Sequence, residues 1–419
     1  MTENNNTKDS DGQGSVSLSS PAPILTAPER IRETVIVKES IHIRNLGPVK
    51  DVAIADIKPF TVFIGESAGG KSAIMKAVAL FRWLFKQYNL RTYLRASNIT
   101  RSPFNFKMEK HLEYAGLAEF VSDVTDIQYR IYFEDESQPF VIRYVDKKVV
   151  TTGTIPVGGV SYSKLSYVTE TRGFLPFLLR SKGRRPAFEP HFEEMVEDFE
   201  RACAARKELD VHFLNVRFSA ESTPFGWKHR VSSLDGAQYQ IDFKHSSSGI
   251  QNTVPMLLLA SYFAQDLDLA ESFNRALLSA VANSGKLTAF RPVSDTDTLP
   301  KRVFLHIEEP ELGLFPDAQC DLLNRLIALG SRKVCNPLHI MLTTHSPYIL
   351  NHLNLLIQAH DTGNTEFTDG AKLNFDDIAA YHVADGGIED LKMVNHRLID
   401  TNALSDAINV IYNRYEELT

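Results

Sequence analysis

Two short stretches of this sequence combine residue types that can bind phosphate and activate water. The first is GESAGGKS, residues 65–72, which has the spacing G-x-x-x-x-G-K-[ST] of a phosphate-binding loop, or P-loop. Its glycines let backbone N–H groups turn inward around a phosphate, and a following helix adds the positive end of its dipole. Lys71 would reach the β- and γ-phosphates of ATP, and Ser72 would bind Mg²⁺. The residues expected to contact the nucleotide are Gly65, Glu66, Ser67, Ala68, Gly69, Gly70, Lys71 and Ser72.

The second stretch, HIEEPELGLFPD at residues 306–317, places two glutamates directly after the apolar run RVFL. Adjacent residues on a strand point to opposite faces, so Glu308 and Glu309 are expected to have different surroundings. A P-loop needs a carboxylate at the end of a neighbouring strand to complete the Mg²⁺ shell, and Glu308 holds that place. Glu309 would then face the γ-phosphate and act as the base for the attacking water. The alternatives are structural: a glycine-rich turn for the first stretch and the start of a solvated loop for the second.

Two further sites hold residues that can bind a phosphate. His345 ends the apolar run HIMLTT and could donate a hydrogen bond to a γ-phosphate, although a histidine at a strand end is commonly structural. Ser247, Ser248 and Gly249 lie in HSSSGIQ, at the start of an apolar helical run, and predict a second anion-binding helix terminus. If Lys71 binds the phosphate of its own chain, this second terminus is better explained as serving the ATP of another subunit.

The strands and helices that carry these residues can be predicted from hydrophobic patterning. Short β-rich runs fill residues 34–64 and end in a strand at 61–64, and KSAIMKAVALFRWLFKQY predicts a helix of about five turns. The runs DIQYRIYFE and PFVIRYVDKKVV predict a strand pair, HFEEMVEDFERACAARKEL an amphipathic helix and GIQNTVPMLLLASYFAQDL a buried one. RVFLHIEE and LHIMLTTHS predict two strands with the helix AQCDLLNRLIALGS between them. An apolar strand–helix–strand unit indicates a parallel sheet.

Composition narrows the class of protein. The 419 residues are 43% hydrophobic and 23% charged, with a net charge of −7, which is typical of a globular protein and not of a general polyanion binder. Three cysteines without CxxC spacing argue against a disulfide framework or zinc site and favour a cytoplasmic protein. No apolar run reaches 18 residues, so no membrane span is expected. The polar residues 1–33 are predicted to form a disordered tail.

Taken in chain order, these motifs resemble the ABC-type ATPases. The similarity is greatest to the branch of RecF, Rad50, SMC proteins and overcoming-lysogenization-defect nucleases. IEEPELGLFP resembles the acidic motif of that branch, and NLGPVKDVAIADIKPFTVFIGESAGGKS resembles its start; the similarity covers about residues 38–85 and 240–400. It implies an α/β fold of the P-loop NTPase, ABC-ATPase type. That fold has a mixed, largely parallel sheet core, an antiparallel β subdomain and a helical insert that carries the signature motif.

The resemblance also implies roles for particular residues. Ser247, Ser248 and Gly249 would be the signature motif, acting on a partner subunit's γ-phosphate, and His345 would be the switch histidine. The expected ligands are ATP and Mg²⁺. Compact chains of this kind resemble stand-alone ATPase subunits of prokaryotic anti-phage defence systems, which dimerise and act on a separately encoded nuclease or toxin. The implied division is an ATPase domain over 34–419, with 34–85 and 240–419 as the nucleotide-binding core and 86–239 as an insertion.

The sequence departs from the family pattern at several places. The signature reads SSSGIQ instead of LSGGQ, Phe315 replaces a usual histidine, and no glutamine can be assigned to the Q-loop. The absence of a coiled-coil arm disfavours an SMC or Rad50 type, and the segment after His345 is too short for a TOPRIM nuclease. A RecF-like DNA repair ATPase remains the main alternative; a transporter ATPase and a non-hydrolysing P-loop protein are two others. The basic cluster that could contact nucleic acid consists of Arg180, Lys182, Arg184 and Arg185. YVTETR, residues 167–172, resembles a strand-and-arginine stretch of this branch, which makes Arg172 a candidate for the nucleotide or subunit interface.

Overall fold

The structure is a computed structural model of the whole chain. It describes residues 35–99, 107–134, 136–179, 190–224, 226–236, 239–285, 287–293, 299–331, 336–402 and 413–418. The predicted tail at 1–33 lies outside the described residues, as does the basic cluster Arg180, Lys182, Arg184 and Arg185.

A six-stranded sheet forms the centre of the molecule, in the order β15-β14-β3-β13-β12-β7. Neighbouring strands are parallel from β14 to β7, and only the edge strand β15 runs antiparallel. Strands β12 and β13 are adjacent and parallel, with helix α7 between them in the chain, so the predicted strand–helix–strand unit is confirmed. The bounds are β3 Phe60–Gly65, β7 Tyr162–Val168, β12 Lys301–Glu308, α7 Pro316–Ser331, β13 Leu338–Thr344, β14 Ile378–Ala384 and β15 Gly387–Asp390.

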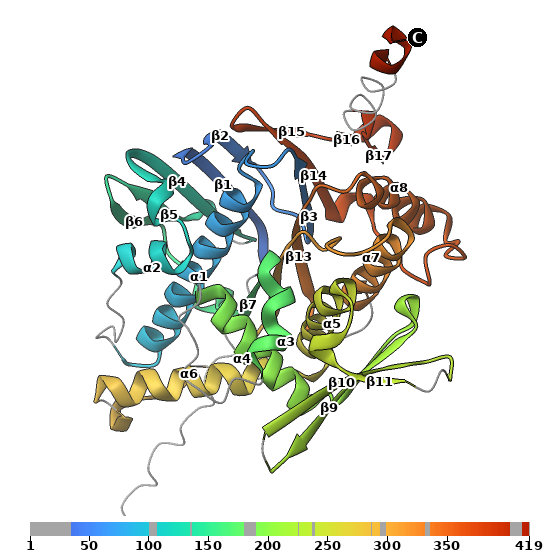
Figure 1. The fold of residues 1–419 in the computed structure, drawn as a ribbon. Coiled ribbons are helices and arrows are strands. Elements are labelled where there is room, and N and C mark those ends of the chain that lie inside the picture. The colour runs from blue at the N-terminus through green and yellow to red at the C-terminus, as the bar shows by residue number, and fades with distance from the viewer. Residues whose placement is uncertain are drawn as a thin grey trace, which may run out of the picture.

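Helices cover the two faces of this sheet. Along β3 the side chains alternate: Phe63 packs in one hydrophobic cluster together with helix α1 (Lys71–Ala96), while Val62 and Ile64 pack in another. That second cluster contains residues of helices on the opposite face, packed with side chains of β3, β12 and β13. One of these helices, α7, lies beside β13 in Figure 1. The bounds of the others are α4 Pro190–Ala205, α5 Ser248–Ser261 and α8 Pro347–Thr362. Helices α1 and α5 therefore lie on opposite faces of the central sheet.

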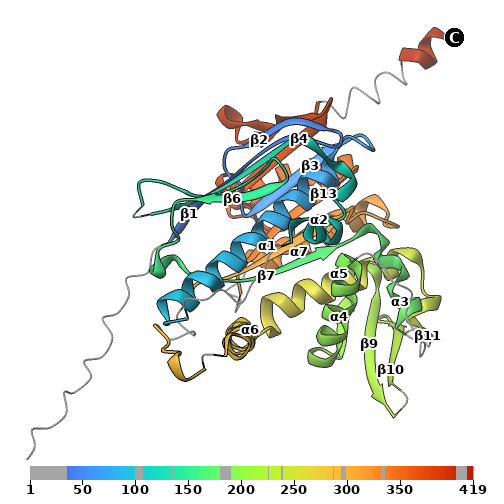
Figure 2. The same ribbon diagram turned by 90° about the vertical axis from the view of Figure 1, so that its left-hand side faces the viewer.

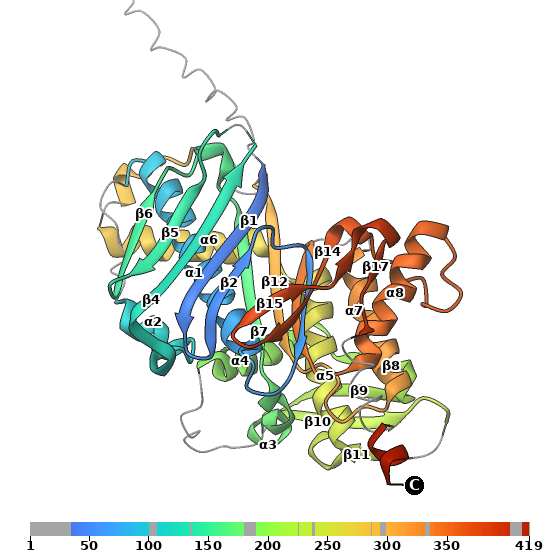
Figure 3. The ribbon, with the colours of Figure 1, turned by 90° about the horizontal axis from the view of Figure 1, so that it is seen from above.

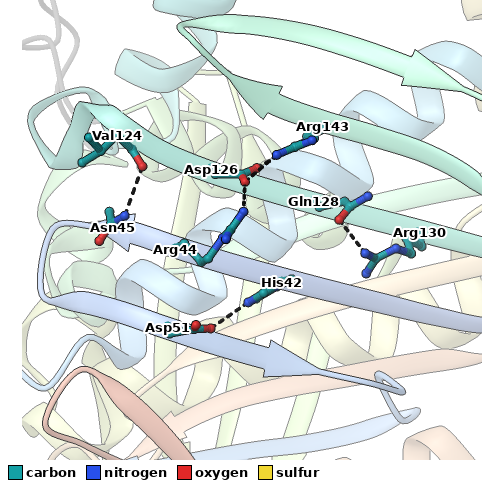
Figure 4. A network of polar contacts seen from close by, with 9 residues as sticks. All are labelled: His42, Arg44, Asn45, Asp51, Val124, Asp126, Gln128, Arg130 and Arg143. Atoms are coloured by element: carbon teal, nitrogen blue, oxygen red, sulfur yellow. Dashed lines mark hydrogen bonds and ion pairs between the residues drawn. The ribbon is translucent and has the colours of Figure 1, made fainter.

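A second, antiparallel sheet covers the other side of helix α1, in the order β2-β1-β4-β5-β6 (Figure 2). Its inward side chains, such as Ile43 and Ile127, share a core with Phe81 of α1. Its outer face carries polar pairs between strands, among them Asp126 with Arg143 and His42 with Asp51 (Figure 4). The bounds are β1 Ile36–Leu46, β2 Val49–Ile54, β4 Val121–Phe133, β5 Phe140–Val145 and β6 Lys148–Thr152. The antiparallel pairing of β4 with β5 confirms the strand pair predicted for DIQYRIYFE and PFVIRYVDKKVV.

A third sheet and several further helices and short strands make up the rest of the described fold. A four-stranded antiparallel sheet, β11-β10-β9-β8, lies at the opposite end from the five-stranded sheet (Figure 3). Its strands are β8 Glu208–Val211, β9 Val216–Thr223, β10 Gly226–Ser233 and β11 Gln240–Asp242. The other elements are α2 Met108–Tyr114, the 3₁₀ helix η3 Glu170–Phe174, α3 Leu175–Leu178, α6 Leu269–Ser284, β16 Lys392–Met393 and β17 Leu398–Ile399.

Two details differ from the sequence-based expectation or refine it. Helix α1 has 26 residues and continues past the predicted end, because Leu90, Tyr93 and Leu94 of its later turns are also buried. The segment 86–239 contributes β4–β6 to the five-stranded sheet and β7 to the central one. None of the described helices has the length and apolar character needed to cross a bilayer.

Candidate functional site

The P-loop joins strand β3 to helix α1 and needs glycine at two backbone positions. Gly65 has φ +151°, and a Cβ there would lie 2.3 Å from the Val383 carbonyl oxygen. Gly70, the residue before α1, has φ +107°, and a Cβ would lie 3.0 Å from Val49. Any other residue would strain the loop, so its path depends on these glycines. The Nζ atom of Lys71 donates to the carbonyl oxygens of Gly65 (3.0 Å) and Glu66 (2.8 Å), which holds the ammonium group over the loop.

The N-terminus of helix α1 is suited to an anion. No side chain caps it, and its first turn contains no acidic residue, so no side chain of the cap satisfies its N–H groups. Burial lowers the pKa of Lys71, and the nearby carboxylates of Glu309 and Glu311 act in the opposite direction. A cation held beside free helix N–H groups is the arrangement that recognises the phosphates of a nucleotide. The residues present therefore fit ATP.

Glu308 is the last residue of β12, and its carboxylate is held by the neighbouring strand. It is buried, with 5% exposure, and its Oε1 accepts a 2.8 Å hydrogen bond from the Tyr167 hydroxyl. Its Oε2 accepts a longer one, 3.4 Å, from the backbone N–H of Glu170. Burial raises the pKa of Glu170, and the charges of Glu308 and Glu309 raise it further. A buried, oriented carboxylate at this place fits a Mg²⁺ ligand, since Mg²⁺ is usually held by one or two carboxylates together with phosphate oxygens.

Glu309 turns away from the strand. Its φ is +43°, in the left-handed region that non-glycine residues rarely adopt, and its N–H donates to the Thr343 carbonyl (2.9 Å). The two acids therefore have different surroundings, as expected. The cause is the backbone turn at Glu309, and not the alternation of side chains along a strand. The Oε1 atom of Glu309 lies 3.4 Å from Nε2 of His345, and both side chains are partly exposed, at 27% and 34%. The structure thus brings together the predicted base and the predicted switch histidine.

Glu311, the third acid of the stretch, fixes the end of β13. Its Oε1 accepts hydrogen bonds from the Thr344 hydroxyl (2.8 Å) and from the backbone N–H of His345 (2.7 Å). This contact sets the position of the backbone that carries the His345 ring. The acidic stretch and the TTHSP run are therefore one structural unit.

The predicted signature residues begin helix α5. Ser247 precedes the helix, no side chain caps it, and its first turn has no acidic residue. Ser247 and Ser248 are exposed, while Gly249 is buried against the loop after the acids. A Cβ on Gly249 would lie 2.6 Å from the carbonyl oxygen of Gly313, so only glycine allows this approach. The Gln251 side chain donates to the carbonyls of Lys244 and Ser246 (2.9 Å each) and holds the turn that precedes the helix.

One sequence-based suggestion is corrected and some residues were missed. Arg172, suggested for the nucleotide or subunit interface, has no exposed surface and cannot contact either directly. Tyr167 was not recognised, because the tyrosine of an apolar strand carries no signal for a contact with a residue 141 positions away. Glu311, the third acid of HIEEPELGLFPD, was assigned no role from the sequence. The contact of Glu311 with the TTHSP run could have been predicted only if the register of strands β12 and β13 had been known.

Comparison with known proteins supports the assignment in part. Residues 190–350 match the model of the family described as AAA ATPase domain, which spans less than half of the chain. The match includes helix α5, the acidic stretch and the His345 run, while the P-loop lies upstream of it. Among curated proteins, no match is found.

Three solved structures are similar at low identity. One is an SMC head bound to the C-terminal winged-helix domain of ScpA (14% identity, TM-score 0.37, 85% of this chain and 98% of that chain). Another is a dimeric post-hydrolysis state of the ATP-binding cassette MJ0796 with ADP and Pi (11% identity, TM-score 0.30, 83% of this chain and 96% of that chain). The third is the recombination mediator RecF with a bound ATP analogue (10% identity, TM-score 0.35, 85% of this chain and 99% of that chain). TM-scores this low carry no argument for a shared mechanism.

Proposed function

We propose that the protein is an ATPase that works as a dimer around two ATP molecules, because residues 190–350 match the AAA ATPase domain model and a P-loop precedes them. Each nucleotide would lie between the P-loop and acid pair of one subunit and the α5 N-terminus of the other. The hydrolysis cycle would control a separately encoded effector.

The observation that carries the dimer is the placement of two uncapped helix N-termini. Helices α1 and α5 lie on opposite faces of the central sheet, and Ser247 and Ser248 are exposed at the start of α5. Lys71 and the α1 terminus already provide a phosphate site for the chain's own nucleotide. The exposed α5 terminus is then available to a phosphate bound by another copy of the chain.

The chemistry of one site divides among four side chains. Ser72 and Glu308 would hold Mg²⁺, which when bound would neutralise charge on the phosphates. Glu309 would accept a proton from the attacking water, and its 3.4 Å approach to His345 lets the histidine hold the carboxylate in place. His345 could also donate to the γ-phosphate, as the sequence suggests.

We propose that the effector is a nuclease or toxin of prokaryotic anti-phage defence and that the protein works in the cytoplasm. This part rests on the sequence resemblance. A RecF-like ATPase that binds DNA directly is the alternative, and the basic cluster at Arg180, Lys182, Arg184 and Arg185 favours it. Salt-dependent DNA binding that disappears when these four residues are neutralised would favour the alternative. If the wild-type protein does not bind DNA, the effector model is preferred.

The proposed base is tested by Glu309→Gln. We expect ATP turnover to fall by about 100-fold or more, the contribution typical of a general base, while ATP binding is retained. The measurements are steady-state phosphate release and binding of a fluorescent ATP analogue. A matched control is Glu366→Gln, a change outside the site. Turnover at the wild-type rate in Glu309→Gln would show that Glu309 is not the base.

A further inference from the structure

Arg172 lies in the 3₁₀ helix η3, directly after the edge strand β7, and is the largest fully buried side chain among the described residues. Its guanidinium group donates four hydrogen bonds, all to backbone carbonyl oxygens. Nη1 donates to Thr169 (3.1 Å) and Glu308 (2.7 Å), Nη2 to Glu309 (2.6 Å) and Nε to Asn252 (3.1 Å). One side chain thus joins three separate segments.

Burying this cation is costly, so its position calls for an explanation. Removal from water lowers the pKa of Arg172 to about 10, and the surrounding charges of Glu311, Glu308, Glu309 and Glu170 oppose this shift. A buried guanidinium is usually paired with a carboxylate in bidentate geometry. Here the nearby carboxylates provide the counter-charge, while the donors themselves hold main-chain atoms. The arrangement is therefore suited to fixing a backbone.

The backbone that Arg172 holds belongs to two functional elements. The Glu308 and Glu309 carbonyls flank the left-handed turn that aims the proposed base, since Glu309 has φ +43°. The Asn252 carbonyl is in the early part of α5, and the Asn252 side chain donates to the carbonyl of Ser248 (2.9 Å), the exposed residue at the helix start. The close packing of Gly249 on Gly313 is a second contact between the same two elements. Movement of α5 would thus be transmitted to the turn at Glu309.

In the proposed dimer, these two elements act on different ATP molecules. The acid pair serves the ATP bound by its own subunit, while α5 serves the ATP bound by the partner. We propose that Arg172 is a positioning residue that couples the two ATP sites of the dimer through the interior of each subunit. This inference rests on the proposed function and goes beyond it, because a dimer around two ATP molecules could also have two independent sites.

The test uses a mixed dimer with one working site. The first protomer carries Ser248→Arg and the second carries Glu309→Gln, each with its own affinity tag, and the mixed dimer is purified through both tags. One site then combines the P-loop and acids of the first protomer with the α5 of the second, and this site is intact. The other site is blocked on both sides. Arg172→Lys is then added to the first or to the second protomer, and the turnover of the single site is measured.

Coupling through Arg172 predicts that both placements lower turnover by about tenfold or more, the change expected when hydrogen bonds from a charged donor are lost. Because Arg172 also holds α5 directly, the decisive comparison is between mixed dimers whose first protomer carries either Ser248→Arg or the wild-type Ser248, with the other site blocked in both by Glu309→Gln of the second protomer. This change at α5 should alter turnover at the first protomer's own acid pair when Arg172 is present, and should leave it unchanged when the first protomer carries Arg172→Met. An effect of the same size with and without Arg172 would overturn the coupling. A loss confined to the placement in the first protomer would show a local role at the acid pair and overturn the coupling. ATP binding by the first protomer is expected to change less than twofold in either case.

Two controls separate coupling from damage to the fold. Arg172→Met removes the buried charge and all four hydrogen bonds, so it should give the same pattern with a larger loss, and the thermal unfolding of each variant is measured alongside to detect damage to the fold. Arg206→Lys, at an arginine that pairs with Asp266 away from the site, should leave turnover unchanged. If the mixed dimer without any change at Arg172 hydrolyses no ATP, the sandwich itself is wrong and the coupling falls with it. If it hydrolyses ATP and Arg172→Met in the second protomer has no effect, only the coupling is wrong.

Discussion

Glu308 and Glu309 are neighbours in the chain but are held by different parts of the structure. The Glu308 carboxylate is buried against Tyr167 and the backbone of Glu170, whereas Glu309 leaves the strand through a left-handed turn and approaches His345. The division of labour proposed for the pair follows from this difference. A rigid carboxylate suits a metal ligand, and a partly exposed one suits a base that must meet water.

Tyr167→Phe tests how Glu308 is oriented. The change removes the hydroxyl that donates to Oε1 of Glu308 (2.8 Å) and leaves the ring in place. We expect the Mg²⁺ concentration that gives half-maximal ATP hydrolysis to rise by about tenfold, the usual effect of losing a partner of a metal ligand. The control is Tyr114→Phe, whose hydroxyl contacts the carbonyl of Pro190 instead. An unchanged Mg²⁺ dependence would argue against Glu308 as the metal ligand.

At this scale, sequence reasoning identified the residues with a local signature. The P-loop and the acid pair could be recognised because their chemistry depends on residues close together in the chain. Tyr167 and Arg172 could not be assigned their contacts, because these cross from β7 and η3 to residues more than 130 positions later. The left-handed turn at Glu309 was also unpredictable, because the Arg172 and Thr343 contacts that accompany it are tertiary.

Helix α1 and the five-stranded sheet are the elements that support the P-loop. The sheet packs its inner face on α1, and its outer face carries the polar network of Figure 4. In this network, Asp126 accepts two hydrogen bonds from Arg143 (2.9 and 2.8 Å) and also contacts Arg44 on the neighbouring strand. One carboxylate therefore connects three strands, β1, β4 and β5.

The network predicts a pH-dependent stability. The hydrogen bonds from Arg143 lower the pKa of Asp126 to about 2, although burial acts in the opposite direction, and Arg44 adds to the lowering. Since the folded pKa lies below the ordinary value of 3.8, the stabilisation is complete above that value and is lost as the pH falls towards 2. We expect Asp126→Asn to lower the free energy of unfolding by about 1 kcal/mol at neutral pH, and by less at acidic pH.

Chemical denaturation of wild type and Asp126→Asn at several pH values measures this difference. Asp51→Asn is the matched control, because the Asp51 side chain is exposed and pairs with His42, so the change should lower the free energy of unfolding by less. A difference between wild type and Asp126→Asn that stays constant from neutral pH down towards 3 would contradict the linkage.

The elements were predicted well where the hydrophobic period was clear. The strands β3, β12 and β13 and the helices α1, α4, α5 and α7 follow from their patterns. The pairing of β7 with β12, which adds a strand from the middle segment to the central sheet, could not be foreseen. Strand pairing over such a separation depends on long-range contacts, and an apolar run carries no information about its neighbour.

The molecule as a whole presents two helix N-termini with the properties of phosphate sites, on opposite faces of one sheet. Helix α1 has its lysine and acid pair nearby, whereas α5 offers exposed serines. The sequence indicated this arrangement through the order of motifs, but the opposite placement required the structure. The account depends on a second copy of the chain to complete each site.

The most direct test is the mass of the protein in solution, measured by light scattering with and without ATP and Mg²⁺. The account predicts an ATP-dependent doubling that is stronger in Glu309→Gln, which retains the nucleotide, and that is abolished by Ser248→Arg at the start of α5. A mass that ignores ATP in Glu309→Gln, or a Ser248→Arg variant that dimerises and hydrolyses ATP like wild type, would contradict the shared ATP site.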